Sequence, residues 1–266
     1  MGTKCGCLGE KGKRVNQEEE FLQKRIMDLA NQSYRNQHYT FSGFLSLGEQ
    51  ELVYQALSGM DWAEYTLFGG MEGCERQMVR FGSEQSLGYE EPFPIICIEI
   101  APRMAKFADN LSHRDFLGAL MHLGIERSTL GDILVKEKTA FLFCQEKVRD
   151  FIVQNLDKIR HTSVLCSVCD EIPEMVKPAL LEESLIVSSE RLDGIVAKLY
   201  HLSRSQSILL FREKKVFVNG RCMENNSGVL KEGDVVSVRG YGKFVYEAVQ
   251  HETRKGRLSI RVSRYH

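Results

Sequence analysis

The segment from Arg191 to Gly240 constrains the fold of this chain most, because helical spacing of apolar residues gives way to strand spacing within it. Its first ten residues carry apolar side chains three and four positions apart, which predicts a short amphipathic helix. Ser203 and Gln206 have the spacing of a capping box, which predicts that a second helix begins there. Arg204 then lies in the first turn, beside unpaired N–H groups that favour an anion. The apolar stripe of the first helix comprises Leu192, Ile195, Val196 and Leu199.

Short strands joined by tight turns are predicted after these helices. Val216 and Val218 lie next to the polar residues Lys215 and Asn219, which favours a short strand. Asn219 with Gly220 is the dipeptide preferred in a two-residue hairpin turn, where φ is positive. Residues 233–234 indicate a further turn before an alternating strand at 235–239. Two helices followed by a small sheet are therefore expected here.

This order of elements and motifs resembles the alpha-L RNA-binding domain, also called the S-four domain, from about Ser189 to Tyr246. In that family two helices and a small sheet present a basic face to structured RNA. Family members usually have glycine where Lys214 stands, a position that often needs a left-handed backbone. Lysine there is expected to cost about 1 kcal/mol.

The resemblance and the local charge together nominate ten RNA-binding residues. Basic side chains would contact phosphates, and two polar ones would hydrogen-bond to the sugar-phosphate backbone or to 2′-hydroxyls. The basic set is Arg191, Arg204, Arg212, Lys214, Lys215, Arg221, Arg239 and Lys243, and the polar pair is Ser203 and Asn219.

Charge is distributed unevenly along the chain, although the whole chain has a formal net charge of −1. Residues 189–266 contain 15 Lys and Arg against 8 Asp and Glu, whereas the first 188 residues contain 20 and 28. The C-terminal part therefore has a net charge of +7 and the rest −8. This asymmetry predicts a polyanionic partner for the basic part.

Length and composition predict several domains and a cytoplasmic location. A chain of 266 residues, 43% of them hydrophobic, can bury two or three cores. No run of 18 apolar residues is present, so we expect no membrane association. The polar N-terminal residues lack a signal-peptide core, and Gly6 stands where the myristoylation pattern needs Ser or Thr.

The expected fold class is α+β with several domains. We expect an N-terminal α/β region at 1–81, a ferredoxin-like (split β-α-β) middle domain at 82–175, a connector at 176–188 and an S-four type domain with a basic C-terminal strand at 189–266. The connector is apolar enough that part of it should pack as a strand.

Spacing also places the elements of the first two regions. A first helix should bury Phe21, Leu22, Ile26 and Leu29 on one side. A second helix is expected at 47–57, followed by a hairpin with strands at 63–68 and 75–81. In the middle domain, strands are expected at 95–100, 133–135, 139–144 and 162–166, and helices at 113–123 and 146–156.

The eight cysteines could indicate a metal site, but their spacing is poor for one. Cys166 and Cys169 have Cys-x-x-Cys spacing, and Cys5 with Cys7 could complete four ligands. However, Cys-x-Cys in a polar N-terminus is not the usual paired arrangement. We therefore expect structural or incidental thiols, with no metal and no cofactor.

Across its length the chain resembles the bacterial YlmH family. The resembling segments are FGGMEGCERQMVR at 68–80 and HRDFLGALMHLGIERSTLGDILV at 113–135. The resemblance implies RNA binding linked to the ribosome, the rescue of stalled translation and genes that often lie near cell-division genes. It implies no catalytic residue.

Two motifs resemble enzyme signatures but lack the other residues that those signatures require. His113-Arg114-Asp115 resembles a kinase catalytic loop, but Leu120 stands where that loop has its magnesium-binding asparagine, so a helix start is the simpler interpretation. Arg191-Leu192-Asp193 is similar to the catalytic segment of pseudouridine synthases. Gly194 follows it instead of the residues those enzymes carry, which favours a structural Asp193 that orients Arg191 or caps the helix.

The leading functional hypothesis is a monomeric, non-enzymatic factor that binds structured rRNA or tRNA on the ribosome, with the large subunit as partner, in translation quality control. The runner-up is an RNA-modifying enzyme of the pseudouridine synthase or methyltransferase type that uses the same domain to place its substrate. A third hypothesis, a scaffold for the division machinery, rests only on the acidic N-terminal part.

Overall fold

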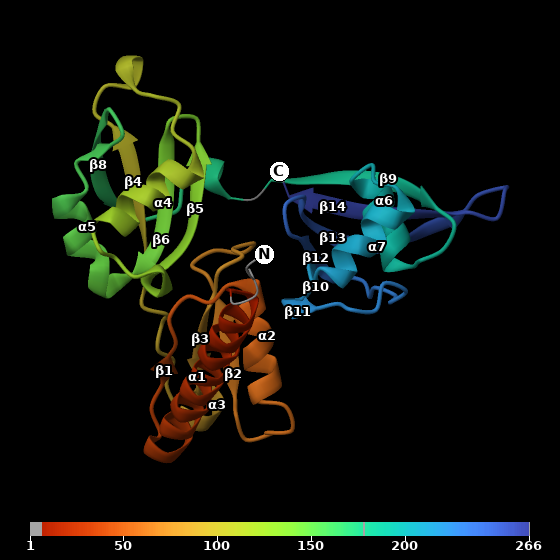
Figure 1. The fold of residues 1–266 in the computed structure, drawn as a ribbon, viewed down its shortest axis with the longest axis horizontal. Coiled ribbons are helices and arrows are strands. Elements are labelled where there is room, and N and C mark those ends of the chain that lie inside the picture. Colours follow the sequence, from red (N-terminus) through yellow and green to blue (C-terminus); the bar gives the residue numbers. More distant parts are fainter. Residues whose placement is uncertain (1–6, 178, 266) are drawn as a thin grey trace, which may run out of the picture. The chain divides into compact units, whose positions relative to one another are not determined.

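The computed structural model describes residues 7–177 and 179–265. It divides into two compact units, Met1–Lys177 and Pro178–His266 (Figure 1). Both units combine helices with antiparallel sheets, which confirms the α+β multidomain class.

The N-terminal part of the first unit packs helices against a three-stranded antiparallel sheet of order β1-β3-β2. A capping box between Ser46 and Glu49 begins the second helix. Apolar side chains from both long helices and from β3, among them Ile26, Val53 and Phe81, form the core. The elements are α1 Cys7–Asn36, β1 Thr40–Phe41, α2 Leu47–Ala56, β2 Tyr65–Phe68, β3 Met78–Phe81 and α3 Glu84–Leu87.

The expected apolar stripe of the first helix is correct at Ile26 and Leu29, which are buried, and wrong at Phe21, which is 73% exposed. Leu22 packs against the core together with those two residues. Phe21 precedes Leu22 by one position and therefore points about 100° away around the helix axis. The apolar face that α1 buries is therefore narrower than the sequence predicted.

The middle part of the first unit is a five-stranded sheet of order β5-β6-β4-β8-β7, in which all neighbours are antiparallel. The third long strand lies between the first and the second, as a split β-α-β arrangement requires. This confirms the expected topology. The elements are β4 Ile95–Pro102, η1 Ala105–Phe107, α4 His113–His122, η2 Arg127–Thr129, β5 Leu130–Lys136, β6 Thr139–Gln145, η3 Glu146–Val148, α5 Arg149–Asn155, β7 Lys158–Ile159, β8 Thr162–Cys169 and η4 Glu174–Val176.

One face of this middle sheet is buried, and the other is covered only in part, since Leu165 of β8 is 57% exposed. On one face, Ile98 and its alternating neighbours pack against α4 and α5 through side chains such as Phe116. On the other face, Phe141 and Phe143 of β6 pack against Phe44 from the N-terminal part. The N-terminal and middle parts therefore share a core. That they are separate domains with a boundary near residue 81 stays a prediction.

Arg76 and Asp132 join the two parts through backbone groups. Arg76 donates from Nε to the carbonyl of Leu130 (3.0 Å) and from Nη2 to that of Phe44 (2.8 Å). The carboxylate of Asp132 accepts from the backbone N–H groups of Glu75 and Arg76. Burial lowers the pKa of the Arg76 guanidinium. These contacts bring together the two segments that carry the YlmH resemblance.

The second unit is a six-stranded sheet of order β11-β10-β12-β13-β14-β9, with two helices packed on it. Ile195 and Phe211 from the helices meet Val236, Phe244 and Ile260 from the strands. The elements are β9 Leu180–Val187, α6 Leu192–Leu199, α7 Arg204–Arg212, β10 Val216–Val218, β11 Arg221–Cys222, β12 Val235–Val238, β13 Gly242–Glu252 and β14 Leu258–Tyr265.

Strand β9 occupies most of the segment that we described as a connector. It pairs with β14 over its whole length, from Leu258 opposite Val187 to Tyr265 opposite Leu180. The expectation that part of this segment packs as a strand is confirmed. Counted from Pro178, the second unit includes the acidic residues of β9 and has 15 Lys and Arg against 10 Asp and Glu, a net charge of +5. In the part of the chain that the structure describes, no helix is apolar and long enough to cross a bilayer.

Two backbone predictions in the second unit are confirmed. Asn219 and Gly220 have φ values of 49° and 78° and link β10 to β11 as a two-residue hairpin turn. Lys214 has a φ of 53°, the left-handed conformation for which glycine is favoured. The lysine at this position is therefore strained.

We predict that Asp132→Ala destabilises the first unit by about 1–3 kcal/mol, because two backbone donors lose their acceptor. Trp62 is the single tryptophan of the chain and packs in the first unit, so its fluorescence during urea unfolding reports that unit. The control Asp150→Ala removes an exposed carboxylate that pairs with the neighbouring Arg149 and should change stability by less than about 0.5 kcal/mol. Equal midpoints for the two variants would contradict this role of Asp132.

We also predict that Lys214→Gly stabilises the second unit by about 1 kcal/mol, because glycine adopts this φ without strain. The exposed ion pair between Lys214 and Glu224 that would be lost contributes little. Hydrogen exchange of the amides of β10 and β12 should slow about fivefold. Lys215→Gly, at a neighbouring position without positive φ, should instead make this exchange faster. Faster exchange in both variants would show that position 214 carries no strain.

Candidate nucleic-acid interface

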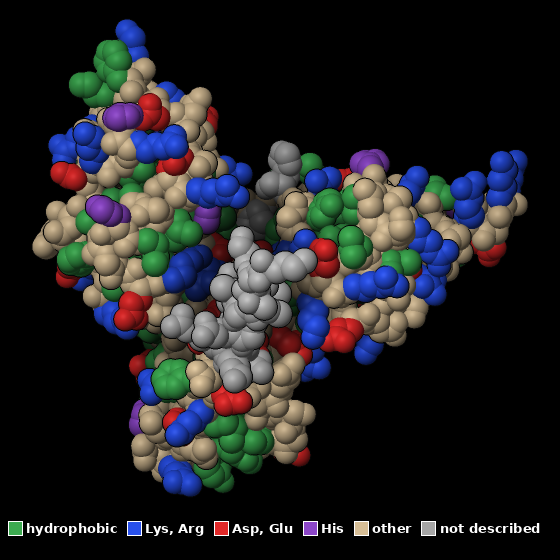
Figure 2. Space-filling model, in the orientation of Figure 1, with side chains coloured by type: hydrophobic (Ala, Val, Ile, Leu, Met, Phe, Trp, Pro, Cys, Tyr) green, Lys and Arg blue, Asp and Glu red, His purple; other side chains and the backbone are tan. Residues whose placement is uncertain are grey.

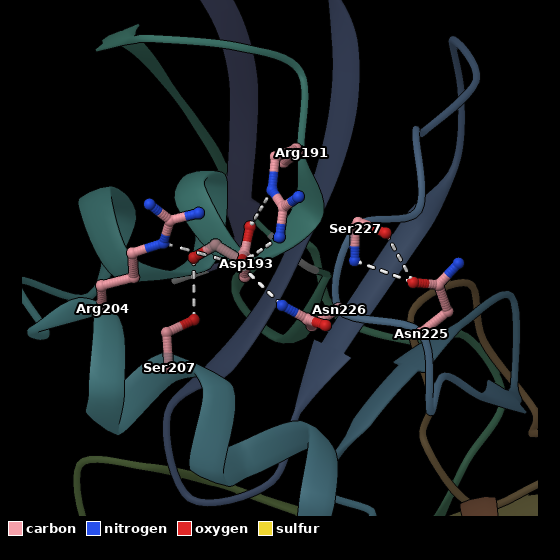
Figure 3. A network of polar contacts seen from close by, with 7 residues as sticks. All are labelled: Arg191, Asp193, Arg204, Ser207, Asn225, Asn226 and Ser227. Carbon is pink, nitrogen blue, oxygen red and sulfur yellow. Dashed lines mark hydrogen bonds and ion pairs between the residues drawn. The ribbon is translucent and has the colours of Figure 1, made fainter.

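The centre of the candidate site is the carboxylate of Asp193, which is only 1% exposed at the start of α6 (Figure 3). Arg191 donates to it from Nε (3.1 Å) and from Nη2 (2.9 Å), and Asn226 donates from Nδ2 (2.7 Å). The backbone carbonyl of Asp193 accepts from Oγ of Ser207 on α7 (2.8 Å). Asp193 therefore ties α6 to α7 and to the loop that contains Asn226, and the expectation that it orients Arg191 is confirmed.

The protonation of Asp193 follows from these contacts. Burial by itself raises the pKa of the carboxyl, but the hydrogen bonds from Arg191 and Asn226 outweigh it and the pKa lies below its ordinary value. Asp193 is therefore charged at neutral pH. Its charge holds the guanidinium of Arg191 in one orientation.

Arg204 lies on the other side of the same carboxylate, as Figure 3 shows. Its Nε is 4.0 Å from Oδ2 of Asp193, yet 72% of its side chain is exposed. The capping box that fixes this position forms as predicted: the backbone N–H of Gln206 donates to Oγ of Ser203 (3.2 Å), and Oε1 of Gln206 accepts from the backbone N–H of Ser203 (2.9 Å). Arg191 and Arg204 thus lie on two sides of one carboxylate, and Arg204 keeps most of its surface for a ligand.

Ser203 and Asn219, the two polar residues nominated for RNA binding, form hydrogen bonds within the protein. Oγ of Ser203 also donates to Oε1 of Gln206 (2.9 Å), so the hydroxyl serves the helix cap. Asn219 donates from Nδ2 to Asp234 (2.8 Å) and accepts from the backbone N–H of Val235 (2.9 Å). A role of either residue in RNA binding stays a prediction.

A second group of cations lies where the strands follow α7. The backbone N–H of Arg239 donates to the carbonyl of Lys215 (2.9 Å), and the Arg239 guanidinium stacks over Phe217 at 4.9 Å from the ring centroid. Lys214 and Lys215 form ion pairs with acidic neighbours at 2.8 and 2.7 Å, and Nζ of Lys243 lies over Tyr265. Arg212 and Arg221 are exposed.

The structure brings Arg191 together with Arg204, and Lys215 together with Arg239. Arg204 and Arg212 are the first and last residues of α7, so roughly 12 Å of helix axis separates them. The nominated cations therefore form two separate groups in the second unit.

The residues nominated from the sequence leave out three further cations. Arg254, Lys255 and Arg257 are all exposed on the turn between β13 and β14, and Figure 2 shows Lys and Arg side chains gathered at the end of that hairpin. Three cations within four residues between two alternating strands is the signal that could have identified them. Asn226 was also missed, because its contact with Asp193 joins residues that are far apart in the sequence.

The cysteines that the structure describes lie in the cores or partly buried. Cys97 and Cys169 are opposite each other on β4 and β8, and burial raises the pKa of both thiols. Among residues 7–177 and 179–265, no group of three or more His, Cys, Asp or Glu side chains is arranged to hold a metal ion. Cys5 lies outside the described residues, as does the side chain of Cys7.

We predict that the second unit becomes less stable at acid pH because Asp193 becomes protonated. Because its folded pKa lies below the unfolded value of about 3.9, its contribution is present above about pH 4 and is lost as pH falls toward the folded pKa. Asp193→Asn should therefore be less stable at neutral pH, and its difference from the wild type should shrink below about pH 4. Hydrogen exchange of α6 peptides across this range measures the difference.

The control for this experiment is Glu224→Gln, which neutralises an exposed carboxylate of the same unit that pairs with Lys214. Its effect on exchange in α6 should be small at every pH, because exposed ion pairs contribute little. If the stability difference for Asp193→Asn stayed constant across the range, the titration of Asp193 would not be linked to folding.

A solved structure, the cell division protein ylmH from Streptococcus pneumoniae, aligns over 64% of this chain and 95% of that chain, with a TM-score of 0.49 and 16% identity. A relative from Bacillus subtilis (strain 168), named ribosome-associated protein quality control protein P2, is 27% identical over 217 residues. The alignment covers 81% of this chain and 83% of the relative.

Residues 89–171 match the family model described as "Putative RNA-binding domain in YlmH". These residues include nearly all of the middle sheet and both of its helices. The chain therefore matches this domain model over 83 of its 266 residues and aligns with the Bacillus subtilis relative over most of its length.

Proposed function

We propose that the protein binds structured rRNA or tRNA on the ribosome, without catalysing a reaction, and that its second unit grips the sugar-phosphate backbone. Two findings support RNA as the partner: the description of the matched domain and the net charge of +5 on the second unit. The name of the Bacillus subtilis relative supports an association with ribosomes and with protein quality control.

The observation that carries this proposal is the arrangement of Arg191 and Arg204 around the buried Asp193. Arg191 is held by two hydrogen bonds, so little of its conformational entropy remains to be lost when a ligand binds. Arg204 is 72% exposed at the first residue of α7. A phosphate that approaches there meets a guanidinium, which can bind it with two parallel hydrogen bonds.

The other nominated cations extend this surface. Arg212, Lys214, Lys215, Arg221, Arg239 and Lys243 supply further phosphate contacts in the proposal, and the hairpin turn with Arg254 adds more. Lys214 and Lys215 would exchange their present carboxylate partners for phosphates, which costs little because those ion pairs are exposed. Such contacts position RNA without reading its sequence.

The geometry of Asp193 also favours a binding role over the RNA-modifying alternative. A catalytic aspartate must reach its substrate, whereas this carboxylate is 1% exposed and accepts three side-chain hydrogen bonds. We propose further that the partner is the large ribosomal subunit and that the protein acts as a cytoplasmic monomer.

We predict a steep salt dependence of RNA binding. With about six phosphate contacts, log K against log salt should have a slope of about −4 to −5. The probe is fluorescein-labelled large-subunit rRNA transcribed in vitro, with affinity followed by anisotropy. Arg204→Gln combined with Lys215→Gln should make the slope less negative by about two, because each lost phosphate contact removes about one. Charge reversal of both residues should weaken binding to all RNA sequences alike.

The control for this pair neutralises Lys147 and Lys158, two exposed cations of the first unit that lie outside the proposed surface. That double variant changes net charge by the same amount and should keep the wild-type slope. A wild-type slope near zero would rule out binding through phosphates. Unchanged affinity after charge reversal of Arg204 and Lys215 would count against this surface.

A further inference from the structure

The loop between β4 and α4 holds the most exposed large apolar side chain among those that the structure describes. Phe107 is 76% exposed, and Met104 in the same loop is 62% exposed. The loop includes the short helix η1 and projects at the top of the first unit, where Figure 2 shows hydrophobic side chains beside Lys and Arg. Neither side chain contributes to a core of the first unit.

Hydrogen bonds hold this loop in place. Nζ of Lys138, in the adjacent hairpin, donates to the carbonyls of Ala105 (2.9 Å) and Ala108 (3.0 Å). The backbone N–H of Arg103 donates to the carbonyl of Ser163 (2.9 Å) at one end of the loop. At the other end, the backbone N–H of Asp109 donates to Oγ1 of Thr162 (2.9 Å). The ring of Phe107 is thus presented to solvent by an anchored segment, so a ligand would meet a pre-organised contact.

One cation lies near the exposed ring, and two others belong to the loop or to its anchor. Nζ of Lys106 is 5.8 Å from the centroid of Phe107, and the side chains of Arg103 and Lys106 are exposed. The anchoring Lys138 adds a third positive charge beside the loop. This combination of one aromatic ring with adjacent cations is the chemistry that binds unpaired nucleotides, in which a base stacks on the ring and its phosphates meet the cations.

The aromatic rings of the middle sheet cannot supply such a contact, because Phe141 and Phe143 are buried. In the common RNA-recognition version of this topology, aromatic side chains on an open sheet face stack the bases. Here Phe141 and Phe143 lie on the face that the N-terminal part covers, and α4 and α5 cover the other face. A base that stacks on an aromatic ring of this domain must therefore use a ring outside the sheet.

We propose that the loop from Arg103 to Asp109 is a binding site for unpaired RNA, in which a nucleobase stacks on Phe107 and Arg103 and Lys106 contact the adjoining phosphates. The proposal rests on the proposed function, and it assigns a second, single-strand-specific contact to the first unit. The loop lies within the residues that match the RNA-binding-domain model. Two apolar side chains are too few for a typical protein interface, which takes about 20–30 residues a side.

The test compares full-length Phe107→Ala and Phe107→Trp with the wild type. The probes are a 12-nucleotide oligoadenylate with 2-aminopurine at its centre and the same strand paired to oligouridylate. Phe107→Ala should raise the Kd for the single strand about 5- to 150-fold and abolish the stacking quench of 2-aminopurine, because one base stack is lost. Binding to the duplex should not change, and Phe107→Trp should retain the single-strand affinity and the quench.

The matched control is Phe151→Ala on α5, which removes another exposed phenylalanine of the same domain and should leave both affinities unchanged. Equal single-strand Kd values for Phe107→Ala and the wild type would overturn the proposal. If Phe107→Ala kept its RNA affinity but lost binding to whole ribosomal subunits, the loop would bind a protein, and the proposal would also fail.

The salt titration separates this proposal from the proposed function. If the rRNA slope and its change in the Arg204 and Lys215 variant are as expected while Phe107→Ala behaves as wild type, only the stacking site fails. If the rRNA slope is near zero, the phosphate-binding surface fails whatever the result at Phe107.

Discussion

The buried carboxylate of Asp193 is the interaction on which the second unit depends. Burying a charge costs several kcal/mol unless it is paired and hydrogen-bonded. Here the guanidinium of Arg191 and the amide of Asn226 supply three donors, and Ser207 ties the same residue to α7. One carboxylate therefore sets the packing of two helices and a loop and the position of Arg191. Arg204, 4.0 Å from that carboxylate and mostly exposed, extends the same charge network to the surface where the proposed phosphate contacts lie.

The middle sheet shows how packing limits function. Its split β-α-β order is shared with many RNA-binding domains, but fold alone does not define a site. Because Phe141 and Phe143 are buried against the N-terminal part, their rings are unavailable to bases. The contacts through Arg76 and Asp132 hold the N-terminal and middle parts together. The burial of these two rings is therefore a fixed property of the first unit. The most exposed ring of this domain is instead Phe107, on the anchored loop.

Local patterns were sufficient to predict much of the fold. The capping box at Ser203, the hairpin turn at Asn219 and the left-handed backbone at Lys214 each depend on neighbouring residues, and each is present. The error at Phe21 arose because composition indicated a wider apolar stripe than the neighbouring elements cover. The contact between Asn226 and Asp193 could not be predicted, because it joins residues that are 33 positions apart in the sequence.

The sequence by itself determined most of the longer helices and strands, the positions of the caps and turns, and the segregation of positive charge toward the C-terminus. These properties depend on residues within a few positions of each other or on composition, both of which are local. Only the tertiary structure decided that β9 completes the second sheet, that Phe141 and Phe143 are buried against the N-terminal part, and that Phe107 stays in solvent. Burial depends on which distant surfaces meet, and that choice is made by the packing of the whole unit.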